Sequence, residues 1–194
     1  MVPSAYVHIP FCDSICAYCD FVRIQKNEQF FASWKDKLIQ EIQEYKIENL
    51  HTLYFGGGTP SLLDIDDFKS IRNCFPKDID EFTVECNPES LDEDKLNAYV
   101  ALGVNRISLG VQSFKDELLK VCNRKHTSKQ AISVIEMIQN SSISTFSIDL
   151  IFGLPNQTME DVKKDIDIFL NLDIPHLSIY SLQIEENSVF GKTG

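Results

Sequence analysis

Three cysteines, Cys12, Cys16 and Cys19, lie close together near the start of the chain, four and then three positions apart. Three thiolates at this spacing can surround one face of a compact iron–sulfur cluster, and they leave one iron without a protein ligand. Because such clusters normally take four cysteine ligands, the spacing predicts a [4Fe–4S] cluster whose fourth iron has an external ligand.

Two other interpretations of this segment stay open on the spacing alone. A structural zinc site needs four ligands, and His8 is available as the fourth, although it falls on the preceding predicted strand. The three cysteines could also be unconnected core residues. The remaining cysteines, Cys74, Cys86 and Cys122, have no partner at metal-ligand spacing, and we interpret them as free buried thiols.

A run of glycines, Gly56-Gly57-Gly58-Thr59-Pro60, closes a short apolar stretch. Glycines at the end of a strand let the backbone approach a ligand without interference from a Cβ. A tight turn is the commoner explanation of such a run when it stands alone. The run lacks the lysine of a phosphate-binding loop, so it does not predict a phosphate site.

Further polar residues fall in or just after predicted strands, namely Glu85, Gln112 and Asp149. Asp149 stands in a very apolar run, and burying a bare charge is costly. It is therefore either a functional carboxylate or a core carboxylate that pairs with a backbone turn. Arg124 is either part of the same site or a surface cation. We assign no role to His51, His126 or His176.

Short apolar runs alternate with amphipathic stretches along the whole chain. The pattern predicts six strands, at Ala5–Ile9, Thr52–Phe55, Phe82–Cys86, Arg106–Gly110, Thr145–Ile151 and Leu177–Leu182. Helices are predicted over 29–46, 65–74, 92–102, 115–122 with 128–139, and 159–171, with helix starts at Ser90 and Thr158. Such alternation indicates a parallel sheet with right-handed crossovers.

A Rossmann sheet and a partial barrel both fit this alternation. A full eight-stranded barrel needs about 250 residues, so six strands favour a partial (β/α)6 TIM-like barrel. On that model Cys86 could lie at the barrel mouth beside Glu85. We expect residues 1–194 to form one α/β domain that is truncated just after strand six, before any helix covers that strand.

The composition restricts the classes of partner. Lys+Arg is 18 against Asp+Glu 29, a formal net charge of -11, which disfavours binding to nucleic acids or anionic membranes. No run approaches the roughly 20 apolar residues of a membrane span, and the start lacks the features of a secretory signal. Bunched cysteines without such a signal favour a reducing compartment, so we expect a cytoplasmic protein.

The C-x3-C-x2-C loop after the first predicted strand resembles the signature of the radical S-adenosylmethionine (SAM) superfamily. That resemblance implies that the amino and carboxylate groups of SAM bind the fourth iron. It also implies that an electron from the cluster cleaves the sulfonium to give a 5′-deoxyadenosyl radical. The glycine run is similar to the superfamily's glycine motif, which receives the SAM amino group.

The motifs together resemble a narrower group, the oxygen-independent coproporphyrinogen III oxidase-like family. The resemblance rests on Tyr6–Cys12, Gly56–Ser61, Gly110–Phe114 and Asp149–Pro155, in order along essentially the whole chain. It implies that the residues around SAM are Tyr6, Tyr18, Gly57, Gly58, Thr59, Glu85, Gln112, Arg124 and Asp149, with Gln183 a weaker candidate. The C-terminal domain of that family is not part of this chain.

The family has two main branches, and one position distinguishes them here. The oxidase branch carries Gly-Cys after the third cluster cysteine, where this chain has Asp20-Phe21. Cys-Asp-Phe is similar to the haem chaperone branch, the HemW group, and so is the ending Leu177–Leu182. The resemblance therefore implies a protein that binds haem as cargo and delivers it to haem-dependent proteins. The receiving protein and the reductant are not identified.

Two alternatives to a haem chaperone stand beside it. The first is an enzyme that oxidatively decarboxylates coproporphyrinogen III to protoporphyrinogen IX. The second, from a different class, is a zinc-stabilised binding module without redox chemistry.

Overall fold

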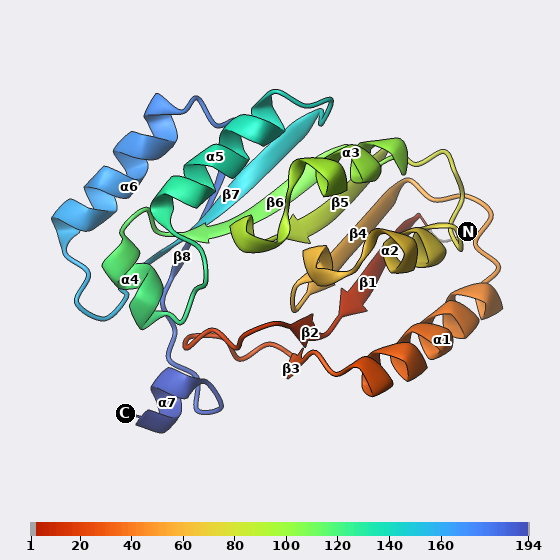
Figure 1. Ribbon diagram of the computed structural model, residues 1–194, viewed down its shortest axis with the longest axis horizontal. Helices are drawn as coiled ribbons and strands as arrows, with labels where there is room; N and C mark the ends of the chain where they lie inside the picture. The colour runs from red at the N-terminus through yellow and green to blue at the C-terminus, as the bar shows by residue number, and fades with distance from the viewer. Residues whose placement is uncertain (1–2, 194) are drawn as a thin grey trace.

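A computed structural model describes residues 3–193 and contains one open parallel sheet (Figure 1). Its six strands lie in the order in which they occur along the chain, which confirms the α/β class and the parallel sheet. β1 and β8 form the two edges and do not pair, so the barrel is partial, as predicted. The strands are β1 (Ser4–Ile9), β4 (Thr52–Gly57), β5 (Glu81–Cys86), β6 (Arg106–Gln112), β7 (Thr145–Phe152) and β8 (His176–Ser181).

Helices connect the successive strands, and each predicted helix is present within a few residues of its expected bounds. In Figure 1, α2, α3 and α5 lie on the viewer's side of the sheet, and α6 flanks its β7–β8 end. The bounds are α1 (Glu28–Glu44), α2 (Ile65–Arg72), α3 (Glu93–Ala101), α4 (Asp116–Val121), α5 (Ser128–Gln139) and α6 (Met159–Asn171).

Polar residues at the helix starts explain where the helices begin. The Thr158 hydroxyl accepts a hydrogen bond from the Asp161 amide, and the Asp161 carboxylate accepts one from Thr158, which confirms the predicted capping box of α6. Such caps stabilise a helix by about 1 kcal/mol. The predicted start at Ser90 is wrong, because Asp92 caps α3. Ser90 instead ends a short 3-10 turn, Pro88–Ser90.

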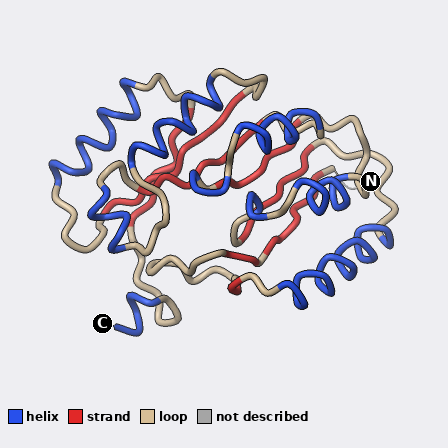
Figure 2. Tube along the Cα trace, viewed as in Figure 1, coloured by secondary structure: helices blue, strands red, loops and turns tan. Residues whose placement is uncertain are grey.

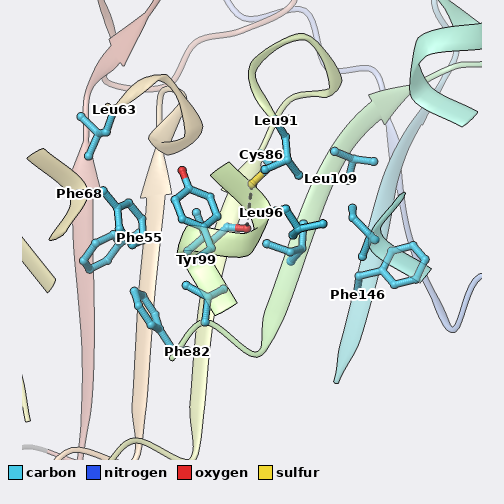
Figure 3. Packing of buried hydrophobic residues seen from close by; sticks show 14 of the residues in the cluster. Phe55, Leu63, Phe68, Phe82, Cys86, Leu91, Leu96, Tyr99, Leu109 and Phe146 are labelled. Atoms are coloured by element: carbon cyan, nitrogen blue, oxygen red, sulfur yellow. Dashed lines mark hydrogen bonds between the residues drawn. The ribbon is translucent and has the colours of Figure 1, made fainter. Parts of the chain in front are cut away.

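The main hydrophobic core fills the space between the sheet and its helices. Alternate strand residues point into it, as the period of two in a strand requires. Figure 3 shows Phe55 and Phe82 from two neighbouring strands beside Phe68 and Tyr99 from the covering helices. Cys86 points into this core and is 3% exposed. It is therefore a free buried cysteine, as expected, but the idea that it faces the barrel mouth is wrong.

Two short strands that the sequence pattern did not predict bracket the cysteine segment. β2 (Phe11–Cys12) pairs in parallel with β3 (Ile24–Gln25), and the loop between them runs below the main sheet in Figure 2. A short helix, α7 (Val189–Thr193), follows β8, and its Phe190 amide donates to the Ala17 carbonyl of that loop. No helix among residues 3–193 is long and apolar enough to span a bilayer.

Candidate functional site

The face of the sheet that points away from the helices is lined by polar side chains. They alternate with the core residues along the same strands, so the pattern that buries the core also directs these groups to one surface. The strand register places these polar side chains side by side on neighbouring strands. Tyr6 lies beside Tyr54, and Glu85 lies beside Ser108. The surface continues at the carboxyl ends of the strands to the cysteine loop, where ligands bind in parallel α/β folds.

Hydrogen bonds hold the cysteine loop against the α4 end of the sheet. The Ala17 amide donates to the Cys122 carbonyl over 2.9 Å, and the Asn123 side chain donates to the Ile15 carbonyl over 2.8 Å. On the other side, the Lys26 amide donates to the Cys12 carbonyl over 2.9 Å. The middle of the loop is therefore anchored to residues more than 100 positions away, and its two ends are bonded to each other.

All three cysteines of the loop are free thiols, and Cys12 is buried while Cys16 and Cys19 are half-buried. Burial raises the pKa of Cys12 and of Cys19, and each thiol also feels the charge of its neighbours. The Arg23 guanidinium opposes this increase at both cysteines. Burial and the charges of neighbouring groups therefore favour the protonated form of Cys12 and of Cys19.

Arg23 is a member of the site that the sequence did not reveal. Its guanidinium donates to the carbonyls of Cys19 and Phe21, so a cation lies next to the third cysteine. A single arginine four residues after a cysteine has no spacing signal that separates it from a surface cation. Only the fold of the loop shows its position.

The donor set fits an iron–sulfur cluster better than a single zinc ion. Among residues 3–193, no three Cys, His, Asp or Glu side chains stand close enough to hold one metal ion. A cluster spaces its cysteines more widely, because each binds a different iron. His8, the candidate fourth zinc ligand, is already engaged at both ring nitrogens, by the Tyr6 hydroxyl at 3.2 Å and the Val22 carbonyl at 2.7 Å.

The glycine run is fastened directly to the start of the cysteine loop. The Gly58 amide donates to the Ile9 carbonyl over 2.7 Å, and the Thr59 amide donates to the Phe11 carbonyl over 2.8 Å. A Cβ on residue 58 would stand 3.0 Å from the Cys12 sulfur and 2.7 Å from the Phe11 carbonyl oxygen. Glycine is required here because the backbone passes so close to Phe11 and Cys12.

Gly57, Glu85 and the tyrosines form one connected group on the polar face. Glu85 accepts hydrogen bonds from the Tyr54 hydroxyl at 2.8 Å and from the Gly57 amide at 3.0 Å. The Tyr6 ring stacks on Tyr54 with ring centroids 5.7 Å apart. Burial raises the pKa of Glu85 above its ordinary value, although both hydrogen bonds oppose that change. This group offers a carboxylate and aromatic surfaces to a ligand.

Arg124 connects the cysteine loop to the ends of two strands and is only 4% exposed. Its guanidinium donates to the Cys16 sulfur at 3.5 Å, to the Asn87 side-chain oxygen at 2.8 Å and to the Gly110 carbonyl at 2.6 Å. It is therefore not a surface cation. A cavity of about 80 Å³ opens beside it and is lined by Asp13, Ser14, Cys16, Thr59, Leu62, Asn87, Glu89, Ser90 and Arg124.

Gln112 and Asp149 lie on the neighbouring strands. Gln112 is buried and adopts a left-handed conformation, with φ 69°, at an irregularity in the β6–β7 pairing. Non-glycine residues in this region are uncommon and often mark functional sites. Asp149 accepts a hydrogen bond from the Ser108 hydroxyl over 3.2 Å, and burial raises its pKa. Its hydrogen-bond partner is a side chain on the adjacent strand, not a backbone turn.

Two of the predicted residues are placed differently from the rest. Tyr18 packs against the second, smaller apolar cluster, which consists of Leu118, Cys122, Ile151 and Leu154. Burial raises its pKa well above the ordinary tyrosine value. Gln183 follows β8, is exposed, and makes no side-chain hydrogen bond within residues 3–193. The structure thus places Tyr6, Gly57, Glu85 and Asp149 on the polar face, and it places Gly58, Thr59, Gln112 and Arg124 at the carboxyl ends of the strands and the cysteine loop.

Comparisons with known proteins agree with this geometry. The model of the radical SAM superfamily matches residues 6–169. The chain is 43% identical over 192 residues to the haem chaperone HemW of Lactococcus lactis, covering 96% of this chain and 51% of that protein. It is 37% identical over 197 residues to the HemW of Bacillus subtilis, covering 96% and 52%.

A solved structure shows the same fold. The radical SAM coproporphyrinogen III oxidase (HemN) of Escherichia coli superimposes with a TM-score of 0.86 at 26% identity, covering 97% of this chain and 45% of that one. The chain spans about half the length of the curated relatives it matches.

Proposed function

Because this chain belongs to the radical SAM superfamily, we propose that it forms the cluster- and SAM-binding half of a haem chaperone. The observation that carries the proposal is the similarity to haem chaperones across 96% of the chain. The alternative of a coproporphyrinogen III oxidase has less support, since the match to that enzyme is at 26% identity. A zinc-binding module is not favoured, because His8 has no free ring nitrogen.

The superfamily implies a [4Fe–4S] cluster and SAM, and the chain offers a donor set for both. Cys12, Cys16 and Cys19 would hold the cluster, with Arg23 and Arg124 as the cations nearest to the loop. When bound, the cluster and SAM supply one-electron reduction and radical chemistry. The loop cysteines would hold the cluster, and Arg23 and Arg124 would screen its negative charge.

The polar face suits the two charged ends of the methionine part of SAM. A carboxylate is matched by the Arg124 guanidinium, which forms strong charge-assisted hydrogen bonds with such groups. An ammonium is matched by Glu85 beside the Gly57 backbone. We propose that Gln112, Asp149, Thr59 and Tyr6 surround the remaining parts of SAM, with Gly58 against Cys12, while Tyr18 lies behind the loop beside Cys16.

Phe21 supports the chaperone branch over the oxidase branch. Its ring is 72% exposed, and the neighbouring Val22 is 76% exposed. The carbonyls of both residues accept hydrogen bonds, from Arg23 at 3.3 Å and from His8 at 2.7 Å. The backbone therefore holds two apolar side chains in solvent at the edge of the cysteine loop. A phenyl ring there cannot take over the ligand or redox chemistry of a thiol, and it suits contact with an apolar macrocycle.

Haem is the proposed cargo. Free thiols and a cluster that oxygen destroys would both require a reducing compartment. We therefore place the protein in the cytoplasm.

The test uses the complete protein with reconstituted cluster, SAM and a chemical reductant under strict anaerobiosis. We expect haem to stay bound through gel filtration, with a haem absorption band in the protein peak, and we expect no conversion of coproporphyrinogen III. The Phe21→Ser variant should retain less haem, while Leu170→Ser, which changes an exposed apolar residue on α6, should not. Formation of protoporphyrinogen IX over many turnovers would overturn the proposed chaperone function in favour of the oxidase.

A further inference from the structure

His126 is fully buried between two segments that carry expected SAM contacts. Its Nδ1 lies 3.2 Å from a carboxylate oxygen of Glu89, and its Nε2 lies 3.2 Å from the Val111 carbonyl oxygen. No sequence pattern assigns this histidine a role. Both partners are acceptors, so both contacts are hydrogen bonds when each ring nitrogen carries a proton. A buried ring bound in this way is held in a single orientation, because turning it would leave buried polar groups without partners.

The contact between His126 and Glu89 connects His126 to Arg124. Glu89 stands 3.2 Å from His126 and 3.9 Å from the Arg124 guanidinium. Burial alone would raise the pKa of Glu89, but the hydrogen bond from His126 and the charge of Arg124 lower it overall. Glu89 is thus held as a carboxylate between the two residues. The Arg124 Nε is buried and has no partner within residues 3–193, so contacts at the other end of the guanidinium determine its position.

The contact between His126 and the Val111 carbonyl connects His126 to Gln112. The Val111 carbonyl belongs to the peptide that precedes Gln112, the residue with φ 69°. A hydrogen bond to that carbonyl fixes the peptide plane next to the strained residue, and such conformations persist only where the surroundings impose them. The residue after His126 is also fixed, because the Thr127 hydroxyl caps α5 by accepting a hydrogen bond from the Gln130 amide.

We propose that His126 is a positioning residue for SAM binding, which orients Arg124 through Glu89 and Gln112 through the Val111 carbonyl. This inference rests on the proposed function, since SAM is the ligand that both residues are expected to contact. His126 touches neither SAM nor the cluster in this assignment. Its effect reaches the ligand through two separate contacts, and the chemistry of the ring allows each contact to be removed alone.

The variants follow from the geometry of the side chains. In His126→Asn the amide nitrogen can take the place of Nδ1 and keep the contact to Glu89. In His126→Gln the longer amide can take the place of Nε2 and keep the contact to Val111. His126→Leu removes both. Glu89→Gln leaves a hydrogen-bonding group beside Arg124 and removes the charge. His51→Leu is the matched control, because His51 also pairs with a carboxylate, Asp80 at 2.8 Å, but on the exposed opposite end of the sheet.

The experiment measures SAM affinity by isothermal titration of the complete, anaerobically reconstituted protein, with iron content and thermal stability recorded for each variant. We expect His126→Leu to weaken SAM binding at least about tenfold, the size expected for a misplaced charge-assisted hydrogen bond. Asn and Gln should each restore part of the affinity, Glu89→Gln should resemble the leucine variant, and all should keep their iron. His51→Leu should bind SAM like the unmodified protein.

The outcomes separate the two proposals. Failure of the unmodified protein to bind SAM would overturn the proposed function itself. SAM binding that is unchanged in a folded, iron-loaded His126→Leu would overturn the positioning role alone, as would reduced thermal stability without any change in affinity. Should the leucine variant not fold, Asn and Gln decide the question, because unchanged affinity in both would equally overturn it.

Discussion

The Arg124 guanidinium donates a hydrogen bond to the Cys16 sulfur over 3.5 Å, although the two residues are 108 positions apart in the chain. The same guanidinium donates to the Gly110 carbonyl at the end of β6. One buried cation thereby joins the middle cysteine of the loop to the end of a central strand. The loop that would hold the cluster and the strand ends that would hold SAM are parts of one connected network.

Replacement of any one of the three loop cysteines should abolish the cluster. We expect Cys16→Ala to lose the visible absorption of the cluster and most of its iron after anaerobic reconstitution, because two thiolates do not retain a [4Fe–4S] centre. Cys74→Ala is the control, since the Cys74 thiol only donates to the Ser70 carbonyl within α2 and its turn. A full cluster spectrum in Cys16→Ala would contradict the assignment.

Gly57→Ala should lower both the free energy of unfolding and the affinity for SAM, although it changes none of the three loop cysteines. Gly57 has φ +118°, and a Cβ there would stand 2.7 Å from the His8 ring. We expect a loss of about 1–3 kcal/mol in the free energy of unfolding from the strained backbone, and a lower affinity for SAM in calorimetry.

Gly103→Ala separates strain from ligand contact. Gly103 also has positive φ, +88°, but a Cβ there meets only Arg72, 3.7 Å away. This variant should lose stability without losing SAM affinity. Equal SAM affinity in Gly57→Ala and Gly103→Ala would show that the glycine run forms a turn and has no role in SAM binding.

Asp149 should make the protein without SAM less stable as the pH rises. Burial raises the pKa of Asp149 above the ordinary value, while hydrogen bonds from the Ser178 and Ser108 side chains oppose that change. A raised pKa means that the folded state favours the protonated form, so the stabilising contribution is complete below the ordinary aspartate pKa and is lost as pH rises through the folded value.

Asp149→Asn keeps an acceptor for Ser108 and removes the charge. Denaturant unfolding at pH 4 and pH 7 should therefore show a larger gain, or a smaller loss, for this variant at pH 7 than at pH 4. The exposed Asp167→Asn is the control and should show no such difference. An Asn variant that is relatively less stable at pH 7 would contradict the prediction.

Asp161 should contribute in the opposite direction. Its carboxylate accepts hydrogen bonds from the Lys115 ammonium at 2.8 Å and from the Thr158 amide at 2.9 Å. The bond from Lys115 is the largest cause that lowers the pKa of Asp161 to about 2. A lowered pKa gives stability that is complete above the ordinary aspartate value and is lost as pH falls towards about 2.

Asp161→Asn should therefore destabilise the protein near pH 7 and have little effect near pH 2, as followed by thermal unfolding across that range. Glu160→Gln, the exposed neighbour in the first turn of α6, serves as the control. An equal loss of stability at both pH values would show that the charge of Asp161 is not responsible.

The amino-acid sequence determined the features that depend on short-range spacing. The strands and their covering helices follow from hydrophobic periodicity, because the period of a strand or helix decides which neighbouring residues share a face. The cysteine loop and the glycine run are also local, and the superfamily model that spans residues 6–169 agrees with them. Asp149 was singled out because a charge in an apolar run requires a partner.

Only the tertiary structure decided which distant residues meet. Glu89 and His126 are 37 positions apart, and no local pattern relates them, because their contact depends on the packing of α5 beside the turn that follows β5. Arg23 and the engaged ring of His8 were hidden for the same reason. Cys86 follows Glu85 directly in the sequence, yet the two residues point to opposite faces, since side chains alternate along β5. The spacing of residues along the chain determines which face of a helix or strand each side chain occupies. The packing between elements determines which distant residues that side chain contacts.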